Sequence, residues 1–196
     1  MKVKLSDIAT VKAGHAFRGK IPEESNGNGY VIQQRDINEN GIINWTGLVR
    51  TEITGRREPD WLEPGDIIFS ARGVRNIATC IDEIEMPVVC GPYYFLIQIN
   101  SGVTDDVLPA FIAWQLNQKK AQRTFGKSLE GSIQVSIRKS VLENIELDIP
   151  DLNKQHAIAE LDYLTKKEQS ILEALINNRK QQMRSIAADL FDSSDA

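Results

Sequence analysis

The sequence predicts an α+β protein in which a compact, β-rich domain with a few helices is followed by one long C-terminal helix of the coiled-coil type. Short apolar segments of strand length, separated by turn residues, recur through the first part of the chain. No Pro or Gly then occurs from residue 155 to residue 191, where apolar residues recur mostly at steps of three, four or seven. An apolar content of 41% with 26% charged residues is typical of a folded protein.

The first half of the chain is predicted to contain one short helix and several strands. Residues 5–13 have apolar positions at helical spacing and are followed by Gly14, which predicts a short opening helix. A polar, basic loop follows it. The strands together are expected to form a twisted, largely antiparallel sheet. We predict them at residues 30–32, 42–45, 67–70, 77–81, 87–90 and 93–99.

One further helix and one further strand complete the compact domain. Asp106 is suited to cap a helix that has Pro109 in its first turn and ends before Gly126. Apolar residues then alternate with acidic ones at positions 145–149, which predicts a half-buried strand leading to Pro150. We therefore place the domain boundary between residues 1–150 and residues 151–196.

The C-terminal helix is predicted to carry an apolar stripe along one side. Its 37 residues, 155–191, would extend about 55 Å at 1.5 Å per residue. A stripe of this length cannot fold back onto one small domain, so we expect part of it to pack against another long helix. The residues that we expect to make this contact, called the apolar stripe below, are Leu161, Leu164, Ile171, Leu172, Leu175, Met183, Ile186 and Leu190.

Composition and motifs argue against several classes of function. The net charge of −4 disfavours nonspecific coating of nucleic acid, and no apolar segment predicts a signal peptide or a membrane span, so we expect a cytoplasmic protein without membrane contact. Cys80 and Cys90 lie in apolar stretches and are expected to be small core residues, not metal ligands. The sequence has no nucleophile motif and no phosphate-binding loop, so we expect no enzyme activity, metal or cofactor.

Three basic or amide-rich groups predict nucleic-acid binding instead. Positions 119–139 hold six cations and one anion, and two smaller groups follow the strands expected at 30–32 and 67–70. Cations and hydroxyls can hold phosphates, while Gln and Arg can pair with base edges. The alternatives are a solvated strand end, a simple turn and a loop that is basic by chance. The candidate DNA-binding residues are Arg18, Lys20, Gln33, Gln34, Arg35, Arg72, Arg75, Asn76, Lys127, Ser132, Gln134, Arg138 and Lys139.

Four phrases in a fixed order resemble the specificity (S) subunit of type I restriction-modification enzymes. They are Leu5-Ser6-Asp7-Ile8-Ala9 with Gly14 after it, the phrase at 62–70 (LEPGDIIFS), the phrase at 131–137 (GSIQVSI) and the helix start at 149–155 (IPDLNKQ). The family carries Pro-Pro and Glu-Gln at this helix start, where the chain has Pro150-Asp151 and Lys154-Gln155. We expect this departure to alter local capping and to leave the architecture unchanged.

The resemblance implies a non-catalytic protein that recognises double-stranded DNA through a target recognition domain, residues 1–150, followed by a spacer helix, residues 151–196. Such subunits direct a methyltransferase (M) subunit and a restriction/translocase (R) subunit to a bipartite site. Ordinary members have two recognition domains and two antiparallel spacer helices, whereas this chain has one of each. It therefore resembles a half-length S subunit, which would restore the full arrangement as an antiparallel homodimer.

Two points remain open at the level of the sequence. The polar gaps in the stripe, at residues 165–170 and 177–182, could select the orientation of a helix pair or mark the docking site of the M subunit. The alternative function is a protein–protein adaptor that acts through the C-terminal helix and does not recognise DNA.

Overall fold

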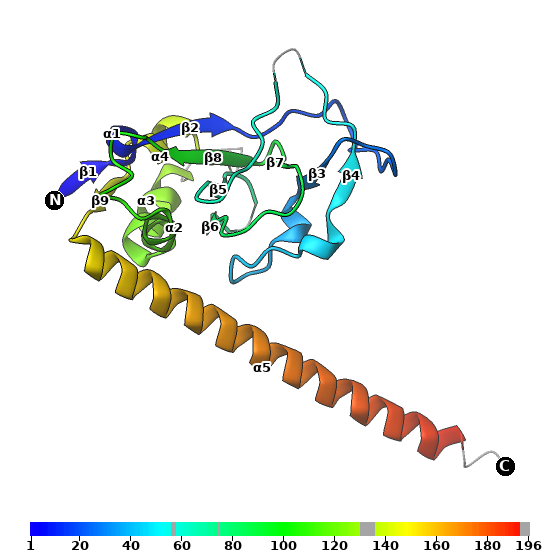
Figure 1. The fold of residues 1–196 in the computed structure, drawn as a ribbon. Helices are drawn as coiled ribbons and strands as arrows, with labels where there is room; N and C mark the ends of the chain where they lie inside the picture. The colour runs from blue at the N-terminus through cyan, green and yellow to red at the C-terminus, as the bar shows by residue number, and fades with distance from the viewer. Residues whose placement is uncertain (56–57, 74, 130–135, 193–196) are drawn as a thin grey trace. The chain divides into compact units, whose positions relative to one another are not determined.

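The computed structural model describes residues 1–55, 58–73, 75–129 and 136–192 (Figure 1). The chain divides into two compact units, Met1–Ala159 and Glu160–Ala196, which we call unit 1 and unit 2. Unit 1 combines short strands with helices, and unit 2 belongs to a single long helix. The α+β class predicted from the sequence is therefore confirmed.

A four-stranded antiparallel sheet forms the centre of unit 1. Strand β5 is IIFS in sequence and is buried along its whole length, since Ile67 and Phe69 face one apolar cluster while Ile68 faces another. A strand buried on both faces has a continuous apolar sequence instead of an alternating one. The strands, in their order across the sheet, are β2 (Ala9–Ala13), β8 (Tyr94–Ile99), β5 (Ile67–Ser70) and β6 (Ala78–Cys80).

Two smaller sheets complete the β-structure. One holds β4 (Val49–Thr51), β3 (Gly29–Ile32) and β7 (Val88–Cys90), and the β3–β7 pair is parallel. The other pairs β1 (Lys2–Lys4) with β9 (Glu146–Asp148). The predicted single, largely antiparallel sheet is thus divided into three sheets, of which one contains a parallel pair.

The opening of the chain differs from the prediction for residues 5–13. Helix α1 spans only Leu5–Ile8, and the chain then continues as β2. The β-branched side chains of Thr10 and Val11 favour a strand, and Val11 is buried while Thr10 is exposed. Pairing of all five residues with β8 overrides the helical spacing of the apolar positions. The predicted strand at 42–45 is also wrong, because only an isolated bridge between Ile37 and Ile43 forms there, followed by the 3-10 helix η2 (Trp45–Gly47).

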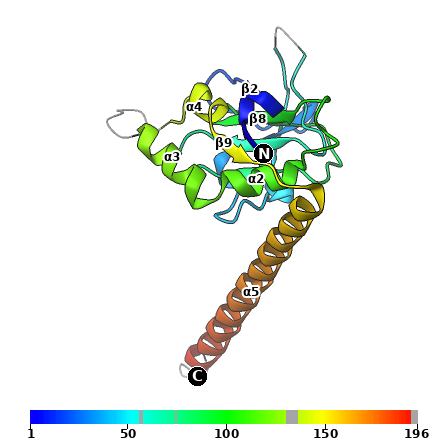
Figure 2. The same cartoon turned by 90° about the vertical axis from the view of Figure 1, so that its left-hand side faces the viewer.

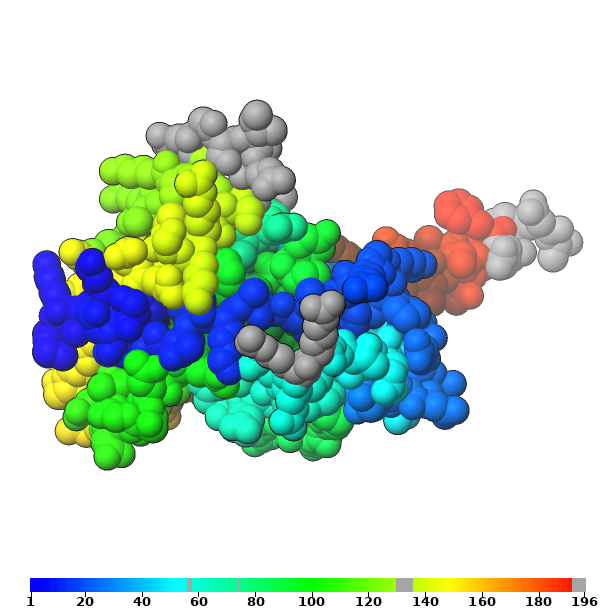
Figure 3. All heavy atoms as spheres, turned by 90° about the horizontal axis from the view of Figure 1, so that it is seen from above, coloured from blue at the N-terminus to red at the C-terminus, as the bar shows by residue number. Residues whose placement is uncertain are grey.

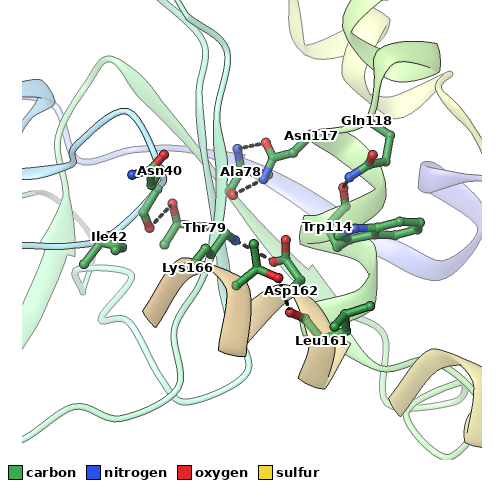
Figure 4. Close-up of polar contacts among 12 residues, drawn as sticks. Asn40, Ile42, Ala78, Thr79, Trp114, Asn117, Gln118, Leu161, Asp162 and Lys166 are labelled. Atoms are coloured by element: carbon green, nitrogen blue, oxygen red, sulfur yellow. Dashed lines mark hydrogen bonds and ion pairs between the residues drawn. The ribbon is translucent and has the colours of Figure 1, made fainter. Parts of the chain in front are cut away.

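The helix expected between Asp106 and Gly126 is two helices, α2 (Pro109–Leu116) and α3 (Lys119–Leu129). Pro109 is the first residue of α2, with Leu108 and not Asp106 at the cap position. Asn117 ends α2, and its side-chain amide makes two hydrogen bonds with the backbone of Ala78, donating to the carbonyl at 2.8 Å and accepting from the N–H at 2.9 Å (Figure 4). This contact to β6 explains the break, which periodicity within one helix cannot reveal.

Helices α2 and α3, with the short α4 (Lys139–Glu143), lie beside the central sheet (Figure 2). The apolar cluster between them includes Phe69, Phe111 and Phe125, all fully buried. The rings of Phe69 and Phe125 lie 5.0 Å apart between centroids. Cys90 is buried as predicted, and burial raises the pKa of its thiol to about 12, whereas Cys80 is only partly buried.

Helix α5 spans Leu152–Asp192, and the predicted long C-terminal helix is confirmed. Asp151 caps it, because its carboxylate accepts a hydrogen bond from the backbone N–H of Lys154 at 3.1 Å. This is the position at which the chain departs from the family's second proline. In unit 2 the side chains of the apolar stripe are between 51% and 66% exposed. Within the described residues, no helix is apolar and long enough to cross a membrane.

Candidate nucleic-acid interface

One edge of unit 1 collects the ends of several strands. Ala13 at the end of β2 and Ser70 at the end of β5 lie opposite the first two residues of β8. Ile32 at the end of β3 is paired in parallel with Cys90 at the end of β7. The loops that follow these strands therefore lie close together on the surface of unit 1. We call this surface the strand-end edge and define it as residues 14–20, 33–36, 71–73, 75–76 and 91–93.

Backbone hydrogen bonds connect the loops of the strand-end edge directly. The N–H of His15 donates to the carbonyl of Cys90 at 2.8 Å, and the N–H of Ala71 donates to the carbonyl of Tyr93 at 2.9 Å. Seen from above, the N-terminal segment in blue lies between the yellow-green region near α4 and the cyan region near β4 (Figure 3). Loops far apart in the sequence thus form one continuous part of unit 1.

The first two groups predicted from the sequence meet at this edge. Gln34 lies in the 3-10 helix η1 (Gln34–Asp36) and donates a hydrogen bond from Nε2 to the carbonyl oxygen of Arg72. Gly73 follows with φ of +112°, and a Cβ there would lie 2.7 Å from the same Nε2 atom. A side chain at position 73 would therefore be strained by this φ and would require the Gln34 amide to shift. Arg75 on this loop forms an ion pair with Glu39 at 2.7 Å.

The third group meets the second through its C-terminal part. Ser136 forms an isolated antiparallel bridge with Arg72, and the N–H of Ile137 donates to the carbonyl of Ala71 at 2.8 Å. Arg138 and Lys139 follow at the start of α4 and are exposed, as is Lys127 near the end of α3. Lys139 lies 3.5 Å from the carboxylate of Glu143. Ser132 and Gln134, which were predicted to bind DNA, lie outside the described residues.

Two of the predicted residues are partly buried. Asn76 is partly buried, donates from Nδ2 to the carbonyl of Ser70 at 2.8 Å and accepts from Gln122 through its own carbonyl. Gln33 is also partly buried, and its Nε2 atom is enclosed without a hydrogen-bond partner in the described part of the chain. Asn76 is therefore better placed to hold its loop than to reach a ligand, and the Gln33 amide nitrogen is enclosed.

Arg35 is the most accessible side chain of the first group. Its side chain is 65% exposed, although its neighbour Asp36 is buried. Burial raises the pKa of Asp36, while the hydrogen bond from the Gln33 N–H and the nearby Arg35 guanidinium oppose the rise. Asp36 therefore fixes the backbone of η1 and leaves the guanidinium directed to solvent. The positive charge of Arg35 is only partly compensated, with 3.7 Å between its Nε and the Asp36 carboxylate.

Arg18 and Lys20 reach the same edge from the loop after β2. Both are exposed. Their loop is held in place by Phe17 and Ile21, which pack on an apolar cluster that includes Val31. These two cations therefore lie on a different loop of the strand-end edge from Gln34 and Arg72.

Tyr93 is a candidate that the sequence analysis did not include. It lies between β7 and β8, its side chain is 45% exposed, and the guanidinium carbon of Arg72 lies 5.4 Å from the centroid of its ring. An exposed aromatic ring beside a cation can stack on a base. The available signal was an aromatic residue directly after Gly91 and Pro92, at the start of the strand predicted at residues 93–99.

The arrangement therefore has the chemistry for binding a polyanion. Arg18, Lys20, Arg35 and Arg72 supply exposed guanidinium and ammonium groups. Gln34 and Tyr93 both contact Arg72. Within the described residues, no group of three or more His, Cys, Asp or Glu could hold a metal ion.

Comparison with known families gives a direct assignment. A sequence model described as the type I restriction modification DNA specificity domain matches residues 1–181. The chain belongs to this family. A search of curated proteins finds no match. The resemblance seen in the sequence motifs is thereby confirmed over most of the chain.

Three solved structures resemble this specificity-domain chain in fold. The HsdS subunit from Thermoanaerobacter tengcongensis has 15% identity and a TM-score of 0.56, with 88% of this chain and 38% of that chain covered. The type I restriction-modification S subunit from M. genitalium has 18% identity and a TM-score of 0.58, covering 92% and 42%. A structure described under complex assembly and conformational transition of the type I R-M system has 13% identity and a TM-score of 0.60, covering 88% and 39%. The chain spans about two fifths of their length.

Proposed function

We propose that this chain recognises double-stranded DNA as a specificity subunit of a type I restriction-modification system and directs M and R subunits to a bipartite site. Membership of the specificity-domain family supports the proposal. The observation that carries it for this chain is that two groups meet at the strand-end edge through the Gln34–Arg72 hydrogen bond, and the third joins them through the Arg72–Ser136 bridge. Cations and amides from loops far apart in the sequence thereby lie on one surface, where they can contact one ligand.

The residues of the strand-end edge and the neighbouring cations of α3 and α4 have different proposed roles. Arg35, Arg72 and Tyr93 are the candidates for base recognition, because they are exposed and lie on loops fixed by hydrogen bonds. The remaining exposed cations are suited to phosphates, which position the protein without sequence information. These phosphate candidates are Arg18, Lys20, Arg75, Lys127, Arg138 and Lys139.

Two chains are proposed to form an antiparallel homodimer through the apolar stripe of α5. The exposed apolar residues of unit 2 support this assembly, because apolar side chains at coiled-coil spacing are stabilised by a second helix. A twofold dimer would present two strand-end edges and would recognise a palindromic bipartite site. In this proposal the chain itself catalyses no reaction, and it acts in the cytoplasm together with its M and R subunits.

The test is to measure binding to DNA duplexes with and without the M subunit. Replacing Arg35 with Ala should reduce discrimination between cognate and altered bases by about 1–3 kcal/mol, since a base-contacting guanidinium is lost. Replacing Lys127 with Ala should weaken binding to all sequences alike and reduce the salt dependence of the affinity. Lys2→Ala is the matched control, because Lys2 is an exposed cation on β1, away from the strand-end edge.

Two outcomes would overturn the assignment. Equal losses on every sequence for Arg35→Ala and Lys127→Ala would remove the distinction between base and phosphate contacts. Absence of DNA binding in every combination of subunits, with helix-mediated association intact, would favour the protein–protein adaptor instead.

A further inference from the structure

The side chain of Gln155 is completely buried in the first turns of α5. Its Oε1 atom accepts a hydrogen bond from the backbone N–H of Leu108 at 2.9 Å. Its Nε2 group donates to two backbone carbonyls, those of Asp106 at 2.8 Å and Pro150 at 2.9 Å. Both N–H groups and the oxygen of this amide are therefore paired with backbone atoms.

These three bonds connect the start of α5 to two other parts of unit 1. Asp106 and Leu108 precede α2, and Pro150 follows β9. Ile158, one turn further along α5, packs against the main apolar cluster of unit 1. Residues up to Ala159 belong to unit 1, so the first two turns of the long helix are part of unit 1, which we also call the recognition unit.

An amide at this position has a role that an apolar side chain could not fill. A buried Leu or Met would pack in the same volume but would leave the Leu108 N–H and two carbonyls without these partners. Apolar packing is also weakly directional, whereas hydrogen bonds weaken steeply when their angle changes. Three bonds to two separate segments therefore resist both tilting and rotation of the helix start.

We propose that Gln155 is a positioning residue that determines the direction in which α5 leaves the recognition unit, and hence the preferred spacing between two DNA half-sites. The proposal rests on the proposed function. From Gln155 to Leu190 the helix rises about 52 Å, so a tilt of about 5° at Gln155 would move its far end by about 4.5 Å. The rise of DNA is about 3.4 Å per base pair, so a small tilt corresponds to a change of one base pair in spacing.

The experiment compares selection of spacing with selection of bases in the complex with the M subunit. Bipartite sites are first selected by the wild-type complex from a randomised duplex library. Affinities are then measured for the selected site, for sites with one base pair added to or removed from the spacer, and for sites with altered half-sites. Gln155→Glu keeps the size and the acceptor but replaces the donors with an oxygen facing two carbonyls. Gln155→Met is the second variant, in case the buried charge prevents folding.

Two control variants separate positioning from stability and from the change of residue type. Gln169→Glu makes the same substitution at an exposed position of α5. Ile81→Val is expected to lower stability through a small cavity in a different apolar cluster, away from the helix start. Neither residue lies on the strand-end edge.

We expect the Gln155 variants to lose at least about tenfold in preference for the cognate spacing, since one lost buried hydrogen bond alone corresponds to about that factor, with unchanged preference for half-site bases. Both controls should retain the spacing preference. Retention of this preference in a folded Gln155 variant, or an equal loss in Ile81→Val, would overturn the proposal.

Amide hydrogen exchange of the free protein tests the anchor without DNA. Residues 155–159 should exchange faster in the Gln155 variants, while β8 exchanges as in the wild type. Unchanged exchange at the helix start would overturn the anchoring role. If the wild-type complex selects no bipartite sequence, the proposed function fails, and the exchange measurement alone then decides whether Gln155 holds the helix.

Discussion

Replacing Leu175 with Ala should weaken the proposed homodimer by an amount that can be worked out from its exposure. Burying a whole Leu side chain contributes about 1.5–3 kcal/mol. Leu175 is 52% exposed, so roughly half of this remains to be gained from a partner helix. A twofold dimer contains two copies, which gives a loss of about 1.5–3 kcal/mol and raises the dissociation constant about 10-fold to 150-fold. Ala keeps high helix propensity, so the helix itself should remain formed.

Sedimentation equilibrium over a range of concentrations measures this dissociation constant directly. Arg184→Ala is the matched control, because Arg184 is exposed, lies outside both polar gaps of the stripe and is about 180° around the helix from Leu175. The control should dimerise as the wild type does. A wild-type protein that stays monomeric at all concentrations, or a Leu175→Ala variant with an unaltered constant, would refute the assignment of the stripe to a homodimer.

Two further changes test the interior of unit 1. Gly14→Ala should destabilise the fold by about 1–3 kcal/mol in urea unfolding, because its Cβ would lie 2.2 Å from the carbonyl oxygen of Gly91. A variant as stable as the wild type would show that the backbone segments at Gly14 and Gly91 can separate without cost. Asp66 has a pKa raised above 3.8 by burial, against hydrogen bonds from the Glu63 N–H and the Gln98 amide. The folded protein therefore binds this proton more tightly than the unfolded chain, and the contribution of Asp66 to stability rises as the pH falls through the folded pKa and levels off below the unfolded one. As the pH falls from about 7 to about 4, the free energy of unfolding of the wild type should rise relative to that of Asp66→Asn. A constant difference between the two proteins over that range would contradict a raised pKa of the Asp66 carboxyl.

The sequence predicts best those elements whose pattern is local. Strands β3, β5, β6, β7 and β8 lie where apolar runs between turn residues placed them, and α5 follows from the absence of Pro and Gly. Prediction from the sequence fails where a residue far away in the sequence determines the local secondary structure. Residues 9–13 have apolar positions at helical spacing, yet pairing with β8 makes them a strand. Asn117 ends α2 because its amide bonds to Ala78, a residue in a different element.

The candidate site shows the same division. The chemistry of Arg35 and Arg72 was visible in the sequence, since each follows a predicted strand. Their common edge was not, because it depends on the parallel pairing of β3 with β7 and on the Gln34–Arg72 hydrogen bond. Asn76 has the residue type of a base contact, but its amide donates to the Ser70 carbonyl. Residue type alone does not show whether a side-chain amide is available to a ligand or already bonded to the backbone.

By itself, the sequence determined that this protein has a β-rich unit and a long helix with an apolar stripe, and its ordered motifs indicated the specificity-domain family. Periodicity and turn residues carry that information because they act over a few neighbouring positions. Only the tertiary structure decided which loops share an edge and that Gln155 connects the start of α5 to the segments before α2 and after β9. The bonds from Gln155 to the segment before α2 join residues more than forty positions apart, and their geometry depends on how the whole unit packs.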